Sequence, residues 1–200
     1  QLLVTSGMRN ASIDITAANE LGITVCGTLG EPHATAELTW GLLLSLARQI
    51  PKENAASRSG DWQLTIGTGL ANKTLGIIGL GRLGSQVARV GNGFSMNVVA
   101  WSANLTDERA AEVGVTRVDK ETLLETSDFV SIHLVLSDRT HGLINAIDLD
   151  RMKSTAYLVN TSRGPIIDET ALINALENGS IAGAGLDVFD VEPLPPDHPF

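Results

Sequence analysis

The stretch Lys73–Gly84, which reads KTLGIIGLGRLG, decides the fold. Its first half contains an apolar run, Thr74–Ile78, that is typical of a buried strand. Three glycines follow in the pattern G-x-G-x-x-G, at Gly79, Gly81 and Gly84. Where this pattern joins a strand to a helix, the first glycine makes a tight turn and the second lets the backbone approach a pyrophosphate. The third lets the helix pack closely on the strand. The stretch therefore predicts a dinucleotide-binding loop rather than a glycine-rich turn without a ligand.

The residues after this loop indicate where an anion and a ribose would bind. The helix should begin near Arg82 and Leu83, whose N–H groups would face the phosphates with help from the helix dipole. The next expected strand, 97–101, is followed by Ser102, where a site for NAD usually has a carboxylate. A serine binds a ribose hydroxyl without repelling a 2′-phosphate, and Arg109 stands close by in the sequence. NAD and NADP therefore both remain open as cofactors.

Apolar runs and helical stretches alternate along the chain. Expected strands cover 2–5, 23–26, 74–78, 97–101, a short run near 115, 129–134, 156–160 and 182–186. Expected helices cover 10–20, 35–56, 82–91, 107–112, a segment from 119, 146–152 and 168–178. The strands are continuous apolar runs, which indicates that helices cover both faces of a parallel sheet. The predicted fold class is therefore α/β, with a Rossmann-like doubly wound sheet.

The longest expected helix, 35–56, is apolar nearly all round between Trp40 and Ala47. A helix of that kind is expected to be buried between packed layers. Pro51 should kink or split it, because proline removes a helical hydrogen bond and its ring clashes with the preceding turn. The segment 60–72 is expected to be a linker.

The composition disfavours several classes of function. The 200 residues carry a formal net charge of −9, with 43% hydrophobic and 18% charged residues. This balance predicts a folded core and disfavours nucleic-acid binding, which needs a basic face. No apolar run approaches the ~20 residues that cross a bilayer, so no membrane partner is expected. The lone Cys26 indicates a reducing compartment such as the cytoplasm. Because Gln1 leads directly into an apolar run, we expect the chain to be a piece of a longer protein.

Polar side chains follow the last two expected strands, and ligands bind outside the carboxyl ends of strands in open parallel sheets. Arg163 would bind a substrate carboxylate through its planar fork and polarise the adjacent carbonyl. Glu192 would orient a catalytic imidazole. Asp187 would accept an N–H from a nicotinamide carboxamide. From spacing alone, solvated loop charges remain the alternative for all three.

Several ordered motifs now point to one family. They are Ala36–Thr39, Lys73–Gly84, Val159–Gly164, and Gly185–Phe189 followed by Glu192-Pro193. Over essentially its whole length the chain resembles the D-isomer-specific 2-hydroxyacid dehydrogenases, in the branch similar to phosphoglycerate dehydrogenase. The resemblance implies reversible hydride transfer between NAD or NADP and C2 of a D-2-hydroxy or 2-oxo acid. It also implies a homodimer whose active site lies between two domains.

The resemblance assigns domains and roles to parts of this chain. Residues 1–29 would be the end of a flavodoxin-like substrate domain, and 30–200 an incomplete NAD(P)-binding Rossmann domain. By resemblance, Arg163 binds substrate and takes part in catalysis, and Glu192 pairs with the catalytic histidine. Asp187 contacts the nicotinamide, the segment of Thr161 and Ser162 lies beside it, and the amides of Arg82 and Leu83 bind the pyrophosphate. The loop of Ser6, Gly7 and Met8 holds the substrate carboxylate through its N–H groups. No metal site is expected.

The chain departs from the family pattern at two places. Ser102 replaces the usual aspartate, so both NAD and NADP fit the family pattern here. The catalytic histidine of the family belongs to a Pro-His loop that would lie beyond Phe200, so this piece alone should be inactive. His33, His133, His141 and His198 fall at other positions, and we interpret them as hydrogen-bonded loop or strand-end side chains.

Two other functions stay open on the same fold. One is a non-catalytic module that senses NAD(H) and binds another protein. The pair of Arg163 and Glu192 argues against such a sensor, whereas the missing histidine leaves it possible. The other is a dehydrogenase of the formate or phosphonate type, whose substrates are not 2-hydroxy acids.

Overall fold

The computed structural model describes every residue except 8, 9, 11 and 32. The chain divides into two compact units, Gln1–Ala34 and Thr35–Phe200. The boundary expected from the sequence, between residues 29 and 30, lies a few residues earlier. The assignment of the two units to a substrate domain and a cofactor domain stays a prediction.

The first unit contains a parallel pair of strands connected through one helix. Its elements are β1 (Leu2–Thr5), α1 (Ile15–Glu20) and β2 (Thr24–Gly27). The helix begins later than expected because Asp14, not Asn10, is its N-cap. The Asp14 carboxylate accepts the N–H of Ala17 at 2.9 Å. Asn10 Oδ1 instead accepts the N–H of Ser12 and closes a turn before the helix.

The strands of this unit are largely exposed. Leu2 and Val4 are 66% and 60% exposed, so the expectation of a buried strand is wrong within this unit. The physical reason is coverage, since α1 is the one helix that the described residues of this unit provide.

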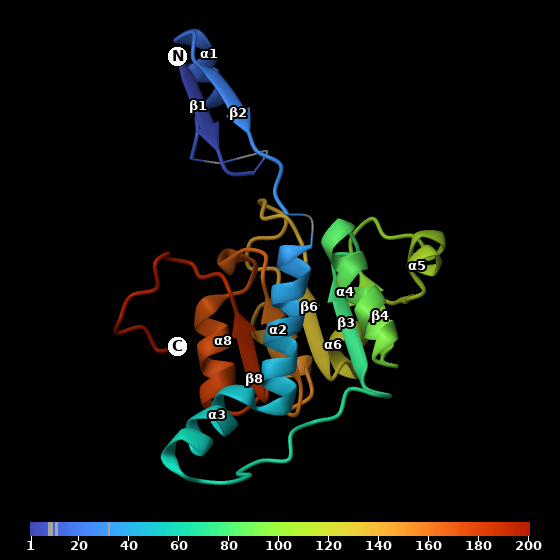
Figure 1. Ribbon diagram of the computed structural model, residues 1–200. Coiled ribbons are helices and arrows are strands. Elements are labelled where there is room, and N and C mark those ends of the chain that lie inside the picture. Colours follow the sequence, from blue (N-terminus) through green and yellow to red (C-terminus); the bar gives the residue numbers. More distant parts are fainter. Residues whose placement is uncertain (8–9, 11, 32) are drawn as a thin grey trace. The chain divides into compact units, whose positions relative to one another are not determined.

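Within residues 35–200, which the structure describes throughout, six parallel strands form one sheet in the order β5-β4-β3-β6-β7-β8 (Figure 1). The strands are β3 (Thr74–Ile78), β4 (Asn97–Trp101), β5 (Thr116–Arg117), β6 (Phe129–Ile132), β7 (Tyr157–Asn160) and β8 (Gly183–Leu186). The register pairs Ile78 with Ile132, Ile132 with Asn160, and Asn160 with Leu186. The loops after these four strands therefore leave the same edge of the sheet. The order reverses between β3 and β6, and ligands bind in the crevice at such a reversal.

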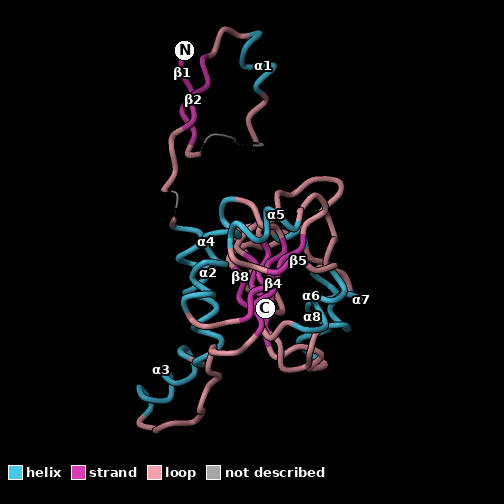
Figure 2. Tube along the Cα trace, turned by 90° about the vertical axis from the view of Figure 1, so that its right-hand side faces the viewer, coloured by secondary structure: helices cyan, strands magenta, loops and turns pink. Residues whose placement is uncertain are grey.

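Helices cover both faces of the sheet, as Figure 2 shows. They are α2 (Ala34–Arg48), α3 (Ile50–Ser59), α4 (Arg82–Gly93), α5 (Asp107–Val113), α6 (Lys120–Thr126), α7 (Ala146–Arg151) and α8 (Glu169–Glu177). Residues of α2, α4 and α5 share one buried cluster with β3 and β4. Residues of α6, α7 and α8 share a second cluster with β6 and β7. The predicted doubly wound α/β fold is confirmed.

The long apolar helix is split into α2 and α3, as Pro51 indicated. The break lies at Gln49, whose φ of 54° is left-handed, and Pro51 occupies the first turn of α3. In α2 the side chains of Trp40 and Leu43 are buried, whereas Leu42, Leu44 and Leu46 are only half-buried. The expectation that this helix is buried all round is therefore wrong within the chain, because the sheet covers only one of its faces. No helix that the structure describes is both long and apolar enough to span a membrane.

Candidate cofactor and substrate site

The glycine-rich loop connects β3 to α4 at the reversal point of the sheet. Gly79 has a φ of 101°, and a Cβ at this position would lie 2.7 Å from the carbonyl oxygen of His133. A Cβ on Gly84 would overlap the carbonyl oxygen of Gly79. Two of the three glycines are therefore required by the protein's own packing. This agrees with the tight turn and the close helix–strand contact expected from the sequence.

Gly81 is different, because nothing in the protein requires its small size. It is the N-cap of α4 with φ −79° and ψ −159°, a conformation that any residue adopts. A Cβ there would meet no atom within 4 Å. The space beside Gly81 therefore opens outward at the start of a twelve-residue helix, where N–H groups and the helix dipole favour an anion. The loop around Gly81, Arg82 and Leu83 fits a dinucleotide pyrophosphate.

Ser102 lies just beyond the end of β4, half-buried, and its carbonyl oxygen accepts the N–H of Leu105 at 3.0 Å. The nearest acidic residue along the chain, Asp107, is paired with Arg117 at 3.3 Å. Arg109 bonds to Glu112 at 2.7 Å and to the Ser85 hydroxyl at 3.4 Å. The structure therefore gives Arg109 partners other than Ser102.

The structure also contains a cavity that sequence reasoning missed. It holds about 160 Å³ and lies between the ends of β4 and β6. Its walls are Trp101, Ala103, Leu134, Ser137, Arg139, Thr140 and Leu143. Trp101 and Ala103 flank Ser102, so the cavity adjoins the expected ribose position. The sequence signal for this cavity was that Leu134 is the last residue of the expected strand 129–134. In the structure β6 ends at Ile132, and tertiary contacts set the path of the loop 133–143.

The end of β7 is organised by Asn160, which is buried at 1% exposure. Its Oδ1 accepts the N–H of Ser162 at 3.0 Å, and its Nδ2 donates to the carbonyl of Arg163 at 2.9 Å. The Ser162 hydroxyl donates to the carbonyl of Ile132, at the end of β6, at 2.9 Å. Asn160 thereby shapes the turn that presents Arg163, whose own side chain is exposed. Sequence reasoning did not assign Asn160 this role.

Thr161 connects the same turn to α2. The hydroxyls of Thr161 and Thr39 lie 2.8 Å apart and both residues are buried. Thr39 donates its one hydroxyl proton to the carbonyl of Thr35 at 2.8 Å, so Thr161 is the donor in the shared bond. Thr161 and Ser162 therefore shape the site through the protein scaffold.

The loops after β7 and β8 meet, as the strand-end argument expected. A Cβ on Gly164 would overlap the main chain of Phe189 and Asp190, so these backbones pass in direct contact. Arg163, next to Gly164, is thus held close to the segment that carries Asp187 and Glu192. Glu192 Oε1 accepts the N–H of Phe189 at 3.0 Å, and the Asp187 side chain is exposed. Their roles toward substrate and cofactor stay predictions.

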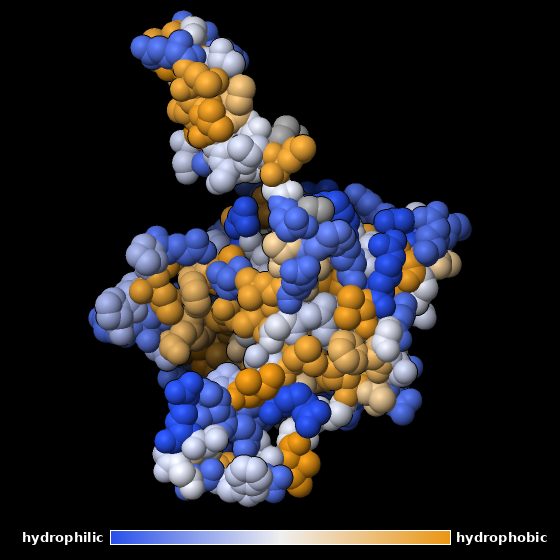
Figure 3. Space-filling view, in the orientation of Figure 1, coloured by the Kyte–Doolittle hydropathy of each residue, from blue (hydrophilic) through white to orange (hydrophobic). Residues whose placement is uncertain are grey.

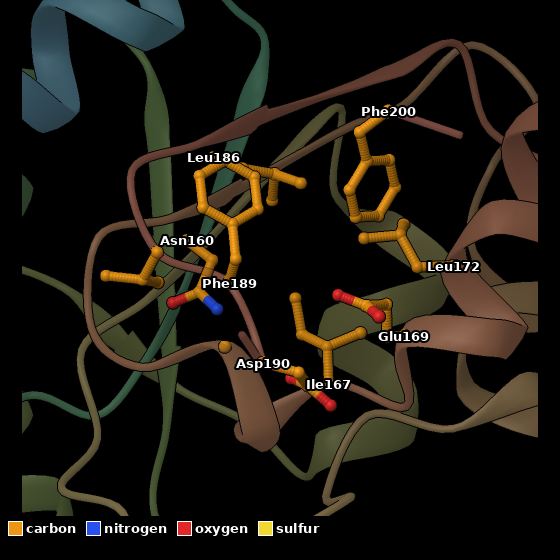
Figure 4. A pocket seen from close by; sticks show the side chains of 10 residues that line it. Asn160, Ile167, Glu169, Leu172, Leu186, Phe189, Asp190 and Phe200 are labelled. Atoms are coloured by element: carbon orange, nitrogen blue, oxygen red, sulfur yellow. The ribbon is translucent and has the colours of Figure 1, made fainter. Parts of the chain in front are cut away.

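A small cavity lies beneath the loop that follows β8 (Figure 4). It holds about 10 Å³, near the room needed for one water and too little for an organic acid. Glu169 and Asp190 contribute carboxylates to it, and burial, followed by the charge of Glu169, raises the pKa of Asp190. His198 Nδ1 accepts the N–H of Phe200, so its Nε2 carries the proton that faces Glu169 at 3.3 Å. These contacts hold the loop that follows β8 against α8.

The described histidines do not contact the candidate catalytic residues. His133 Nε2 bonds to the Ser131 hydroxyl at 2.9 Å, and burial lowers the pKa of His133 to about 4. Its Nδ1 is buried and finds no partner among the described residues. His33 lies in the first unit, and His198 pairs with Glu169.

The predicted substrate loop belongs to the first unit. Gly7 has a φ of 81°, and its N–H donates to the Thr28 hydroxyl at 3.1 Å. Ser6 precedes it after β1, and Met8 lies outside the described residues. The role of this loop toward a substrate stays a prediction.

A glycine loop at the reversal point of a doubly wound sheet, with a rim of charged residues beyond the neighbouring strands, defines a dinucleotide-binding domain. Residues 40–200 match the family model described as D-isomer specific 2-hydroxyacid dehydrogenase, NAD binding domain. The chain belongs to this family, which confirms the resemblance found in its motifs.

Curated relatives and solved structures agree with this assignment. The chain is 45% identical to a glyoxylate reductase of Thermococcus litoralis over 192 residues, covering 91% of this chain and 58% of that protein. It is 42% identical to D-3-phosphoglycerate dehydrogenase of Bacillus subtilis, covering 94% of this chain and 36% of that protein. The crystal structure of a phosphoglycerate oxidoreductase from Vibrio cholerae superimposes with a TM-score of 0.92 and 34% identity, covering 99% of this chain and 65% of that one. The chain thus spans less than two thirds of the length of these relatives.

Proposed function

We propose that the protein containing this chain is an NAD(P)-dependent dehydrogenase that reversibly reduces a 2-oxo acid to a D-2-hydroxy acid. Two features at one edge of the sheet support this proposal. One is the open glycine loop at Gly81, and the other is the turn that presents Arg163 beside the Asp187–Glu192 loop. Relatives named glyoxylate reductase, D-3-phosphoglycerate dehydrogenase and D-lactate dehydrogenase support a substrate of this class.

In this proposal each residue has a defined task. The first turn of α4 binds the pyrophosphate, Ser102 accepts or donates a hydrogen bond at the ribose, and Asp187 accepts an N–H of the carboxamide. The bound nicotinamide supplies or receives the hydride. Arg163 binds the substrate carboxylate with its guanidinium fork and polarises the neighbouring carbonyl. Glu192 orients a histidine from elsewhere in the protein, which supplies the proton to the carbonyl oxygen.

The test is replacement of Arg163 in the full-length protein. Arg163→Ala removes a charge-assisted fork, so kcat/KM for 2-oxo acids should fall by about 10- to 150-fold, while the cofactor Kd should hardly change. Arg163→Lys keeps the charge but loses the fork, so it should recover only part of the loss. An unchanged kcat/KM in Arg163→Ala would refute the assignment. Cofactor binding without reduction of any 2-oxo acid would instead favour the sensor.

We also propose that the protein is a homodimer formed over α2 and β8. In the space-filling view, apolar surface lies over α2 and β8 (Figure 3). A groove here is lined by the apolar side chains of Leu42, Leu46, Ala184 and Leu186, with Ser45, Gln49 and Lys52 among its other lining residues. A second copy would cover these half-exposed side chains. Leu46→Glu should produce monomers in analytical ultracentrifugation, and an unchanged mass would contradict this interface.

An exposed, free Cys26 suits a reducing compartment, and we propose the cytoplasm.

A further inference from the structure

The cavity between the ends of β4 and β6 has one charged wall residue. Of the residues that line it, Trp101, Ala103, Leu134 and Leu143 are apolar or aromatic, and Arg139 alone carries a charge. A largely apolar cavity with one cationic lining residue suits a purine ring that carries an anionic group. Because Trp101 and Ala103 flank Ser102, the ribose of an adenosine in this slot would lie between Ser102 and the loop that carries Arg139.

The loop holds Arg139 in a tight turn. The Thr140 hydroxyl donates to the carbonyl of Val135 at 2.7 Å and accepts the N–H of Ser137 at 2.8 Å. The main-chain N–H groups of Thr140 and His141 both donate to the carbonyl of Ser137 at 2.9 Å. The backbone under Arg139 is therefore fixed, and only its side chain is free to turn toward a ligand.

The charges around the cavity favour an additional anion. The strand end offers Ser102 where a carboxylate would repel a phosphate. No acidic side chain is among the residues that line the cavity, and the nearby Asp107 and Glu112 are paired with Arg117 and Arg109. The Arg139 side chain makes no hydrogen bond or ion pair with any residue of the described range 33–200. Its neighbour Asp138 lines the adjoining hollow with Leu136 and His141 rather than this cavity.

We propose that this cavity binds the adenosine end of a 2′-phosphorylated dinucleotide, with Arg139 as the residue that binds the 2′-phosphate. The inference rests on the proposed function and deepens it, since it selects NADP over NAD as the cofactor. A guanidinium and a phosphate form short, paired, charge-assisted hydrogen bonds. Ser102 carries no negative charge that would repel the 2′-phosphate. Selectivity for the phosphate therefore comes from its attraction to Arg139 and from the absence of a carboxylate at position 102.

The experiment measures ligand binding by calorimetry on the full-length protein, using 2′,5′-ADP and 5′-AMP as matched probes. The wild type should bind 2′,5′-ADP at least tenfold more tightly than 5′-AMP, since a hydrogen bond to a charged group contributes about that much. Arg139→Ala and Arg139→Gln should each remove this preference and change the affinity for 5′-AMP by less than about threefold. Arg151→Ala is the matched control, because Arg151 pairs with Glu125 at 2.9 Å and does not line the cavity. It should leave both affinities unchanged.

Two further measurements separate this inference from the proposed function. Ser102→Asp should restore repulsion and weaken 2′,5′-ADP selectively, and added salt should reduce the wild-type preference. If Arg139→Ala weakens both probes equally or neither, or if 5′-AMP binds as tightly as 2′,5′-ADP, the role of Arg139 is overturned while NADH binding still supports a dehydrogenase. If neither NADH nor NADPH binds, the proposed function itself fails.

Discussion

Replacing Gly81 with alanine should separate cofactor binding from folding. A Cβ at this position meets no protein atom within 4 Å, and the backbone conformation is one that alanine adopts. Alanine is a poorer N-cap than glycine, but it also reduces the freedom of the unfolded chain. The two effects are similar in size, so the free energy of unfolding should change by less than about 1 kcal/mol.

The same methyl group should cost much more in binding. A pyrophosphate oxygen that accepts an N–H of the first turn must lie about 2.9 Å from the nitrogen. A methyl carbon keeps its neighbours at about 3.5 Å or more, so the pyrophosphate would have to withdraw from the loop. Weakening one charge-assisted hydrogen bond, about 1.5–3 kcal/mol, raises the dissociation constant by roughly 10- to 150-fold.

The assay combines urea denaturation with titration of NADH and NADPH, both on the full-length protein. Gly93→Ala is the matched control, because Gly93 lies at the other end of α4 and also has open space around it. It should stabilise the helix by up to about 1 kcal/mol and leave both dissociation constants unchanged. A Gly81→Ala variant that binds both cofactors as tightly as the wild type, or that unfolds, would rule out this role of Gly81.

Three further predictions concern the surroundings of the site. Because burial lowers the pKa of His133 to about 4, the unfolded chain takes up a proton between about pH 6.5 and 4 that the folded chain does not. The free energy of unfolding should therefore be unaffected by His133 above pH 6.5 and should fall below it, by on the order of 3 kcal/mol more in the wild type than in His133→Gln. Urea denaturation measures both pH profiles, and parallel profiles would contradict the prediction. Thr39→Val should cost about 1–3 kcal/mol, because it leaves the buried Thr161 hydroxyl unpaired. Thr161→Val should cost less, because the Thr39 hydroxyl keeps its bond to the carbonyl of Thr35. The double variant should cost less than the sum of the two. Additive denaturation energies would show that the two hydroxyls do not interact. Gly164→Ala places a methyl group into the main chain of Phe189, so the melting temperature should fall, and an unchanged melting temperature would exclude that contact.

The sequence predicted the sheet well because its signals are local. Strands 74–78 and 97–101 are continuous apolar runs bounded by glycine or polar residues, and the structure places them at the same positions. Asp119 and Asp168 precede their helices and cap them, since their carboxylates accept the N–H groups of Thr122 and Ala171. The helix in the first unit was misplaced because two residues, Asn10 and Asp14, both have the chemistry of an N-cap, and local sequence does not choose between them.

The candidate site was predictable only where strand ends determine it. Arg163 and the Asp187–Glu192 loop were expected near each other because parallel strands end at one edge, and the contact at Gly164 brings their backbones together. The cavity beside Ser102 was not predictable, because the loop that carries Arg139 is shaped by its own turn and by a bridge between Ile144 and Ile167. The hydrogen bond of Glu192 to Phe189 likewise depends on a loop whose path no local pattern specifies.

Hydride transfer to C2 of a 2-oxo acid is the activity that we propose for the protein containing this chain. The most direct measurement uses NADH and NADPH deuterated at C4 of the nicotinamide, with the full-length protein, a panel of 2-oxo acids and mass spectrometry of the products. Deuterium should appear on C2 of a 2-hydroxy acid of D configuration, and Arg163→Ala should suppress this transfer. Tight cofactor binding with no deuterium in any product would contradict it.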